Sequence, residues 1–391
     1  MNKSFIARNP SVLIFLSILA LFTLVVTVLS EGFGVGVIST SFVKVLGKTL
    51  CLCLIAIAMD LIWGYAGILS LGHFAFFGLG GYMIGMWLMY ERTRQIVVGS
   101  LSEGVLPPTP EEITAGIGNQ IFGVVGSSEF PLVWAFADSL VLQLVFVLAV
   151  PGVLALVFGW LAFRSRVTGV YLSILTQAMT LGLSLYLFQN ASGLRGNNGL
   201  SGLQNLPGVT APQSVVSLWF FWASALALGL GYLLIAWVVS GKFGSVIRGI
   251  RDNEARVRFL GYSVETYKLA VFTLTACISG IAGALYYPQA GIINPAEVAP
   301  IASIYLAVWV AIGGRGRLYG AVIGAAFVSL VSSWFTGGQA PDVSLGFYTV
   351  KWVDWWLVLL GLSFVFVTLY APNGIGGLID LFKRKRKETD A

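Results

Sequence analysis

The sequence predicts an all-α polytopic membrane protein with about ten transmembrane helices, and three observations support this fold class. Of the 391 residues, 57% are apolar and 10% are charged, whereas soluble domains carry about 25% charged residues. Apolar runs of about 20 residues recur along the chain, and a helix of that length crosses about 30 Å of hydrocarbon. Basic residues gather in alternate connections, as expected when one side of the membrane is cytoplasmic.

The first apolar run follows the amino terminus and has the features of a retained span rather than a signal peptide. It is longer than the apolar core of a signal peptide, and no small-x-small cleavage site follows it. Nine further runs continue through a single transmembrane domain, residues 1–391. The ten candidate spans are 11–30, 45–64, 68–90, 139–163, 168–190, 217–239, 268–287, 301–314, 318–335 and 352–371.

The eighth span, 301–314, is shorter than the membrane core. A straight helix over these residues rises only about 21 Å, and Gly313 and Gly314 then interrupt the run. Short or glycine-broken segments in transporters often line the substrate path. A boundary drawn too narrowly is the alternative interpretation.

A charged loop at 241–267 fixes the orientation of the chain. From Gly241 to Lys268 there are six basic and three acidic residues between two uncharged spans. The excess of basic residues predicts a cytoplasmic loop, which in turn places both termini and the basic tail 380–391 in the cytoplasm. Residues 91–131 then form a periplasmic loop.

The same loop has an amphipathic pattern. Its apolar residues fall near helical spacing, with charged residues on another face. A cytoplasmic amphipathic helix is a surface that a soluble partner can grip, and an ordinary solvated connection is the alternative. The apolar positions are Phe243, Val246, Ile247, Ile250 and Val257, and the charged face holds Arg248, Arg251 and Asp252.

Composition excludes several functional classes. The net charge of +6 lies beside membrane spans and in the tail, so it indicates topology or contact with the lipid bilayer, not nucleic-acid binding. Cys51, Cys53 and Cys277 lie within apolar runs and are expected to be buried hydrophobes. With His73 as the only histidine, no His-based metal cluster or catalytic triad can form. We therefore expect no catalytic residues and no bound metal.

Neutral polar groups within or beside the spans outline a candidate substrate path. They can both donate and accept hydrogen bonds, which suits a small uncharged polar solute, and the acidic or basic relay of a proton-coupled carrier is missing. His73 is also compatible with a structural role at a helix interface. The path candidates are His73, Phe76, Gln177, Asn190, Thr275 and Ser279.

Small residues recur on two spans. Gly81 and Gly85, like Gly320 and Gly324, are four residues apart, and Gly78 lies on the same helix as the first pair. Such spacing lets helices approach through backbone contacts. Helix packing is the expected role, with substrate lining as the alternative.

Four segments together resemble a known family. They are Asp60–Tyr82 (DLIWGYAGILSLGHFAFFGLGGY), Gly169–Gln177 (GVYLSILTQ), Arg251–Ala255 (RDNEA) and Tyr370–Ile375 (YAPNGI). In this order they resemble the permease subunits of branched-chain amino acid and urea ABC importers. Features closer to the urea permeases are Thr176-Gln177-Ala178, Gly196–Leu200, Ser333–Thr336 and the long loop after Tyr90.

The resemblance implies an ABC importer permease fold in the bacterial inner membrane. It implies a heterodimer with a homologous permease subunit, two cytoplasmic ATPase subunits and a periplasmic substrate-binding protein. ATP and Mg would bind the ATPases, so this chain is expected to hold no cofactor and to be no enzyme. The residues of the ATPase-coupling loop would be Arg248, Arg251, Asp252, Asn253, Glu254 and Gly261.

Three functional readings follow from the residues and the resemblance. The first is a permease subunit of an ATP-driven importer, with urea as the expected solute and branched-chain amino acids as the alternative. The second is an ATP-independent urea channel or carrier, which does not require the amphipathic charged loop. The third is a membrane enzyme, which would need an acid, base, metal or nucleophile constellation that the spans do not offer.

Overall fold

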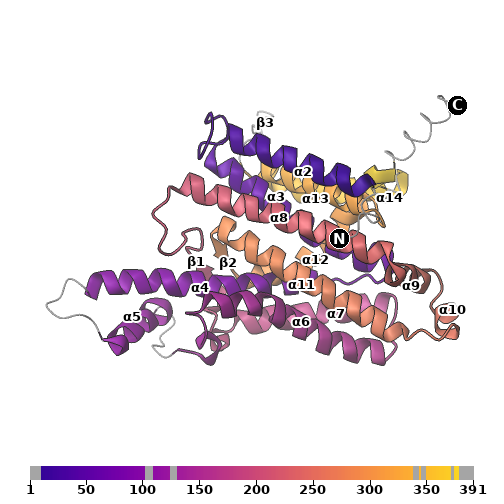
Figure 1. Cartoon of the computed structure of the whole chain (residues 1–391), viewed down its shortest axis with the longest axis horizontal. Helices are drawn as coiled ribbons and strands as arrows, with labels where there is room; N and C mark the ends of the chain where they lie inside the picture. The colour runs from indigo at the N-terminus through magenta and orange to yellow at the C-terminus, as the bar shows by residue number, and fades with distance from the viewer. Residues whose placement is uncertain are drawn as a thin grey trace.

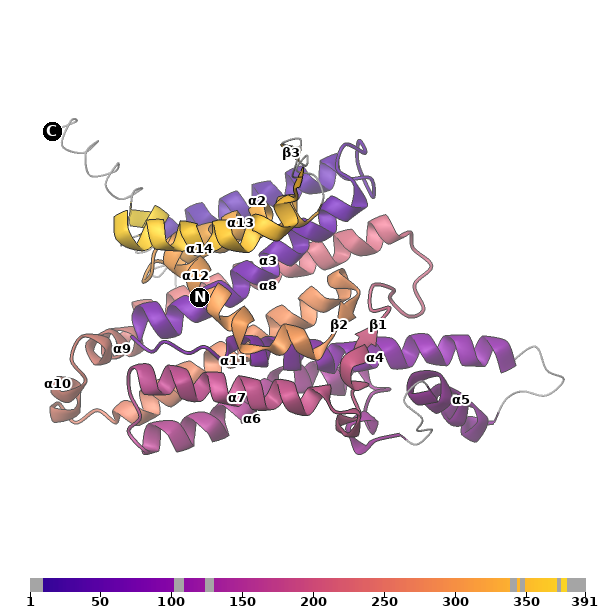
Figure 2. The same ribbon diagram turned by 180° about the vertical axis from the view of Figure 1, so that it is seen from behind.

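The computed structural model describes residues 10–101, 109–123, 130–337, 343–344, 349–370 and 374–377. Long helices lie side by side and run along the longest axis of the molecule (Figure 1). The short helices α9 and α10 lie at one end of this bundle and α5 lies at the other, as both views show (Figure 2). The predicted basic tail, 380–391, lies outside the described residues.

Helices of membrane-spanning length make up most of the bundle. Within the described residues, seven helical stretches are long and apolar enough to cross a membrane, while α12 and α14 are shorter apolar helices and α4 carries charges in its second half. The long helices are α2 (Pro10–Leu29), α3 (Thr40–Asp60), α4 (His73–Leu101), α6 (Leu140–Arg164), α7 (Val170–Phe188), α8 (Gln213–Ser240), α11 (Val264–Ala290), α12 (Pro300–Gly313), α13 (Leu318–Thr336) and α14 (Trp352–Tyr370).

Short elements connect these helices at both ends of the bundle. The two antiparallel pairs are β1 with β2, in the register Leu200 to Ile293, and β3 with β4. The short elements are η1 (Leu61–Tyr65), α5 (Pro110–Phe122), η3 (Leu132–Trp134), η4 (Asn190–Ser192), η5 (Gly196–Asn198), β1 (Leu200–Ser201), α9 (Lys242–Asp252), α10 (Glu254–Phe259), β2 (Ile292–Ile293), η6 (Pro295–Val298), β3 (Val343–Ser344) and β4 (Thr349–Val350).

Each of the ten candidate spans contains a helix; α3, α8 and α11 begin four or five residues earlier than expected, and the largest differences concern α4. The helix expected to begin at residue 68 begins at His73. Gly67 adopts a positive φ of 75°, and the chain between Gly67 and His73 is irregular. The helix also continues past Tyr90 to Leu101, so the loop expected over 91–131 starts as helix. An ion pair of 3.2 Å between Glu91 and Arg94, one turn apart, stabilises this extension.

The segment after α4 contains a second helix that packs back onto the first. The Thr109 hydroxyl and the Glu112 side chain form a capping box at the start of α5, an arrangement that satisfies two helix N–H groups. Ile117 and Ile121, one turn apart, are fully buried beside the extended end of α4. The spacing of this apolar pair is a sequence signal for a helix, and the prediction of a loop over 91–131 overlooked it.

The core centres on α3 and α11. Every residue from Leu50 to Asp60 in α3 is buried, and α3 packs against α8, α11 and α13. Helix α11 also packs along α4 and α6. By contrast, α2 leaves most of its apolar side chains exposed, as expected for a helix that faces lipid.

Candidate coupling element and substrate path

The charged loop folds into two short helices, α9 and α10, which with the following turn to Gly261 form what we term the coupling element (residues 242–261). Ile247 and Ile250 bury the apolar face of α9 against the bundle. The Asn253 side chain caps α10 by accepting a hydrogen bond of 3.0 Å from the Arg256 N–H. The two helices lie at the end of the bundle away from α5 (Figures 1 and 2).

Ion pairs fasten the coupling element to α11. The Glu254 carboxylate receives Lys268 at 2.6 Å and Arg258 at 3.0 Å, and Arg258 also donates to Glu265 at 2.6 Å. The two acceptor carboxylates raise the pKa of Arg258. Four charges of alternating sign therefore link α10 to the first turns of α11, so that the two elements are expected to move together.

Arg251 joins the coupling element to the end of α3. Its guanidinium Nη1 donates a hydrogen bond of 2.9 Å to the Gly64 carbonyl oxygen and its Nε lies 3.0 Å from the Asp252 carboxylate. Gly64 belongs to η1, a π-helical turn that leaves carbonyl groups without the usual helical partner. The Arg251 stem passes over Gly67, where an added Cβ would lie 2.7 Å from its Cγ.

The same π turn also contacts the connection between α12 and α13. The Asp60 carboxylate accepts a hydrogen bond of 2.7 Å from the Gly316 N–H, and the Arg315 guanidinium lies 5.2 Å from the centre of the Trp63 ring. The coupling element, the end of α3 and the turn before α13 therefore converge on η1. We refer to this junction as the η1 latch (Asp60, Gly64, Arg251 and Gly316).

The tip of the coupling element is an exposed apolar surface. Phe259 is 93% exposed and Leu260 is 71% exposed, beside the half-exposed Tyr262. Gly261 adopts a φ of 88°, a conformation that glycine accepts without strain, and so turns the chain back towards α11. An exposed aromatic and aliphatic pair at a charged helix end is the composition expected of a protein-docking surface.

The six coupling residues expected from the sequence lie on this element but have different surroundings. Arg251 and Glu254 point into contacts with the bundle, Asn253 is a helix cap, and Gly261 forms the turn. Arg248 reaches the Val239 carbonyl at 3.4 Å. Sequence reasoning missed the partners Gly64, Lys268 and Glu265, because they are distant in the chain or lie on the next helix.

Two of the path candidates, His73 and Phe76, lie in the contact between α4 and α11. Their ring centres are 6.0 Å apart, and Phe272 of α11 lies 6.5 Å from His73 and 5.5 Å from Phe76. Both imidazole nitrogens are buried without a hydrogen-bond partner among the described residues. The imidazole of His73 therefore lies among aromatic side chains, and its nitrogen atoms remain available to donate or accept a hydrogen bond.

The other four candidates are not brought to one place. Thr275 and Ser279 are fully buried, but their hydroxyls donate to carbonyls of their own helix at 2.9 and 2.8 Å. Gln177 is half-buried on α7, and Asn190 is exposed in η4. Hydroxyls in helices commonly bond in this way without serving a ligand.

The irregular segment before α4 is held by hydroxyl groups that sequence reasoning did not select. Thr176 accepts from the Leu71 N–H at 3.0 Å, Ser173 donates to the Leu69 carbonyl at 2.7 Å, and Ser303 accepts from the Phe74 N–H at 3.1 Å. These bonds satisfy backbone groups where no helix does. The i, i+3 spacing of Ser173 and Thr176 is the signal that could have found them.

Of the five glycines expected at helix contacts, three lie against another long helix and two lie against residues of η6 and β1. A Cβ on Gly320 would lie 2.7 Å from the Gly313 carbonyl oxygen, and one on Gly324 would overlap the Trp309 carbonyl, so α12 and α13 meet through backbone. A Cβ on Gly81 would overlap the Tyr287 ring of α11. The other two are Gly78, which faces Val298, and Gly85, which faces Leu200.

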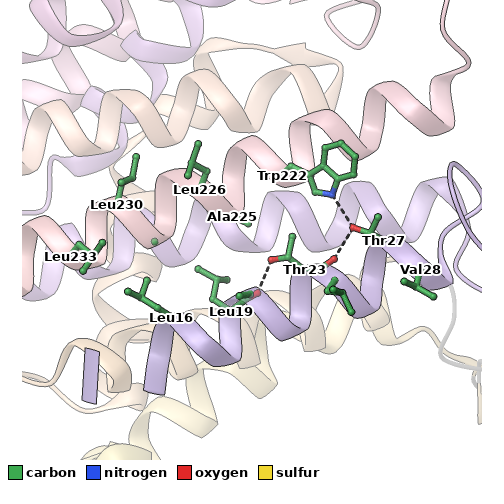
Figure 3. A pocket seen from close by; sticks show the side chains of 13 residues that line it. Leu16, Leu19, Thr23, Thr27, Val28, Trp222, Ala225, Leu226, Leu230 and Leu233 are labelled. Carbon is green, nitrogen blue, oxygen red and sulfur yellow. Dashed lines mark hydrogen bonds between the residues drawn. The ribbon is translucent and has the colours of Figure 1, made fainter. Parts of the chain in front are cut away.

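A groove of about 700 Å³ between α2 and α8 has a different character. Leucine and other apolar residues line most of it, and Figure 3 shows Trp222 bonded to Thr27, at 2.9 Å, near one end. The Thr23 and Thr27 hydroxyls both donate to carbonyls of α2. The groove offers almost no free polar group, so it does not suit the passage of a polar solute.

The fold is that of a multi-pass membrane protein. The chain belongs to the family described as the branched-chain amino acid transport system permease component, which matches residues 41–368. We therefore describe it as a permease component and not an enzyme, located in the bacterial inner membrane.

Individual relatives match over a part of their length. The chain is 27% identical over 189 residues to the high-affinity branched-chain amino acid transport system permease protein LivM of Salmonella typhimurium, covering 43% of this chain and 44% of that protein. It is 29% identical over 195 residues to the autoinducer 2 import system permease protein LsrC of Escherichia coli, covering 48% and 56%. The chain thus spans about half the length of the curated relatives it matches. No solved structure matched the chain.

Proposed function

We propose that this chain is a permease subunit of an ATP-driven importer of a small nitrogen-containing solute. The observation that carries the proposal is the coupling element, whose exposed tip at Phe259 is connected through Arg251 to the end of α3. A channel or self-sufficient carrier has no need of a charged docking helix tied to its central span. The family match supports the same class.

The η1 latch supplies the mechanical step of this proposal. Arg251 bonds to Gly64 at 2.9 Å, and Asp60 bonds to Gly316 at 2.7 Å. A displacement of α9 and α10 by a moving ATPase would therefore reach α3 and the α12–α13 turn without passing through a flexible loop. Buried α3 would transmit it to the core helices.

The proposal includes the partners that such an importer requires. Two ATPase subunits would grip the coupling elements, and they would hold ATP and Mg. A homologous second permease would complete the path, and a periplasmic binding protein would deliver the solute. The exposed apolar side chains of α6 and α7 leave enough uncovered surface for lipid and for a second subunit.

Two solute classes are supported by different observations. The relatives named for branched-chain amino acid transport favour these amino acids. The segments Thr176–Ala178, Gly196–Leu200 and Ser333–Thr336 favour urea through their resemblance to urea permeases. Both solutes present N–H donors to a protein acceptor, which neutral and anionic oxygen atoms can recognise.

The test is uptake of labelled leucine and labelled urea by proteoliposomes that hold the full complex, with and without internal ATP. We expect one of the two solutes to accumulate only when ATP is enclosed and the binding protein is present. Accumulation that is independent of ATP would contradict the importer assignment. Comparison of the two labels decides between the solute classes.

A further inference from the structure

A half-buried carboxylate, that of Glu297, lies at the end of the bundle away from the coupling element. Glu297 lies in η6, the turn between α11 and α12, directly after the β1–β2 pair. Figures 1 and 2 place this pair at the far side of the bundle from α9 and α10. In the orientation expected from the basic residues, this end faces the periplasm.

Contacts within the turn and from two other elements, α4 and α7, hold it in place. The Asn294 side chain accepts from the Ala296 N–H at 2.9 Å, and Pro295 restricts the backbone at the first position of the turn. The Ser184 hydroxyl of α7 donates to the Pro295 carbonyl at 3.1 Å, while Val298 packs against Gly78 of α4. The carboxylate is therefore presented by a rigid turn, which suits recognition.

Tyrosine hydroxyls and one lysine surround Glu297. Glu297 interacts electrostatically with Tyr82 of α4, with Tyr286 and Tyr287 of α11, and with Lys48 of α3. The Tyr82 hydroxyl is fully buried and makes no hydrogen bond with the described residues, while the Tyr287 hydroxyl interacts with the Glu297 carboxylate itself. Buried polar groups rarely remain without a partner, so the Tyr82 hydroxyl is available to a polar ligand.

The two charged groups are close enough to attract each other and yet do not pair. Among the described residues, Glu297 and Lys48 form no ion pair within 4.0 Å, although each is half-buried. Burial raises the pKa of Glu297 to about 7, while the Tyr287 hydroxyl and Lys48 act in the opposite direction. A carboxylate and an ammonium that lie near each other without forming an ion pair can bind the opposite charges of a small zwitterion.

We propose that Glu297, Tyr82 and Tyr287 form an outer recognition site that accepts the N–H groups of the imported solute, with Lys48 opposite them. The shared ligand chemistry is a nitrogen that carries several hydrogens, either the ammonium of an amino acid or the amide of urea. In the amino-acid case the solute carboxylate faces Lys48. The inference rests on the proposed importer function and adds the residues that select its solute.

The test measures ATP-dependent uptake of labelled leucine and labelled urea by proteoliposomes that hold the whole complex, at a saturating concentration of the binding protein. The substitution Glu297→Gln keeps the size of the side chain and removes its charge, so we expect uptake to fall at least about tenfold, since bonds to charged groups are the strong ones. Glu297→Asp keeps the carboxylate and should restore part of the uptake. Glu91→Gln, on the extended part of α4, is the matched control and should retain wild-type uptake.

The pH profile separates recognition from a merely structural role. Because the acceptor must be ionised, uptake by the unchanged complex should rise several-fold as the pH on the binding-protein side rises through about 7. The groups that face Glu297 are Lys48, Tyr82, Tyr286 and Tyr287. Glu297→Gln should flatten this rise, and Glu91→Gln should leave it.

The outcomes are distinct. Loss of leucine uptake in both Glu297→Gln and Lys48→Gln assigns a zwitterion, whereas loss of urea uptake in Glu297→Gln alone assigns an amide. Normal uptake in Glu297→Gln, or reduced uptake with an unchanged pH profile, overturns the recognition site while the importer function stands. If the unchanged complex transports neither solute with ATP, the proposed function itself fails.

Discussion

Replacement of Gly81 by leucine is expected to prevent assembly of a stable permease. An added Cβ would overlap the Tyr287 ring and would lie 3.0 Å from the Ile293 side chain. Tyr287 is fully buried and cannot turn aside. Overpacking a core costs about 1–3 kcal/mol and sometimes more, and here the whole leucine side chain must find space.

The measurement is the midpoint of thermal aggregation of the purified complex, together with its yield on size exclusion. Gly361→Leu on α14 is the matched control, because nothing lies within 4 Å of an added Cβ there. We expect a clear loss of stability and yield for Gly81→Leu and wild-type values for Gly361→Leu. Equal behaviour of the two variants would show that α4 and α11 are not in close contact at Gly81.

Reversal of charge at Arg251 and Glu254 together is expected to abolish ATP-coupled uptake without preventing membrane insertion. Arg251→Glu removes the donor to the Gly64 carbonyl, and Glu254→Arg places a cation beside Lys268 and Arg258. The coupling element would then separate from both α3 and α11. We expect uptake to fall about 100-fold, which corresponds to about 2.7 kcal/mol.

The control for this prediction is a matched reversal at the other end of the protein. Glu91→Arg with Arg94→Glu exchanges an exposed ion pair of 3.2 Å, and such pairs contribute little. ATP hydrolysis and uptake are measured together in proteoliposomes. ATP hydrolysis that continues while uptake is lost would place the defect in coupling. Normal uptake in the Arg251 and Glu254 double variant would remove the η1 latch from the mechanism.

Much of the fold could be predicted because the bilayer constrains the sequence so strongly. Apolar runs of span length and the position of basic residues located the helices, including the short α12 at Pro300–Gly313. The start of α4 could not be predicted, since the π turn at Leu61–Tyr65 and the irregular residues before His73 depend on hydroxyls from α7 and α12. Tertiary contacts decided the backbone there.

The candidate site was predictable in part for the same reason. The amphipathic pattern of residues 243–257 located the coupling element, and Gly81 and Gly324 were found by their spacing. The contact between Arg251 and Gly64 joins residues that are 187 positions apart in the sequence, so no local sequence pattern predicts it. Glu297 was overlooked because a lone acidic residue in a short turn resembles an ordinary solvated loop, and only its buried tyrosine neighbours distinguish it.

The most direct test of coupling through α9 and α10 is a cross-link from the tip of the coupling element. Phe259→Cys introduces a thiol at a position that is 93% exposed. Native Cys51 and Cys53 are buried as expected, whereas Cys277 is only half-buried, contrary to the expectation, so it is replaced by alanine in every variant of this test. Leu132→Cys, 89% exposed in η3, is the control. With a short bismaleimide and the assembled, transport-competent complex, we predict a cross-link to the ATPase from Phe259→Cys and none from Leu132→Cys. A complex that transports with ATP but gives no cross-link from Phe259→Cys would contradict the account.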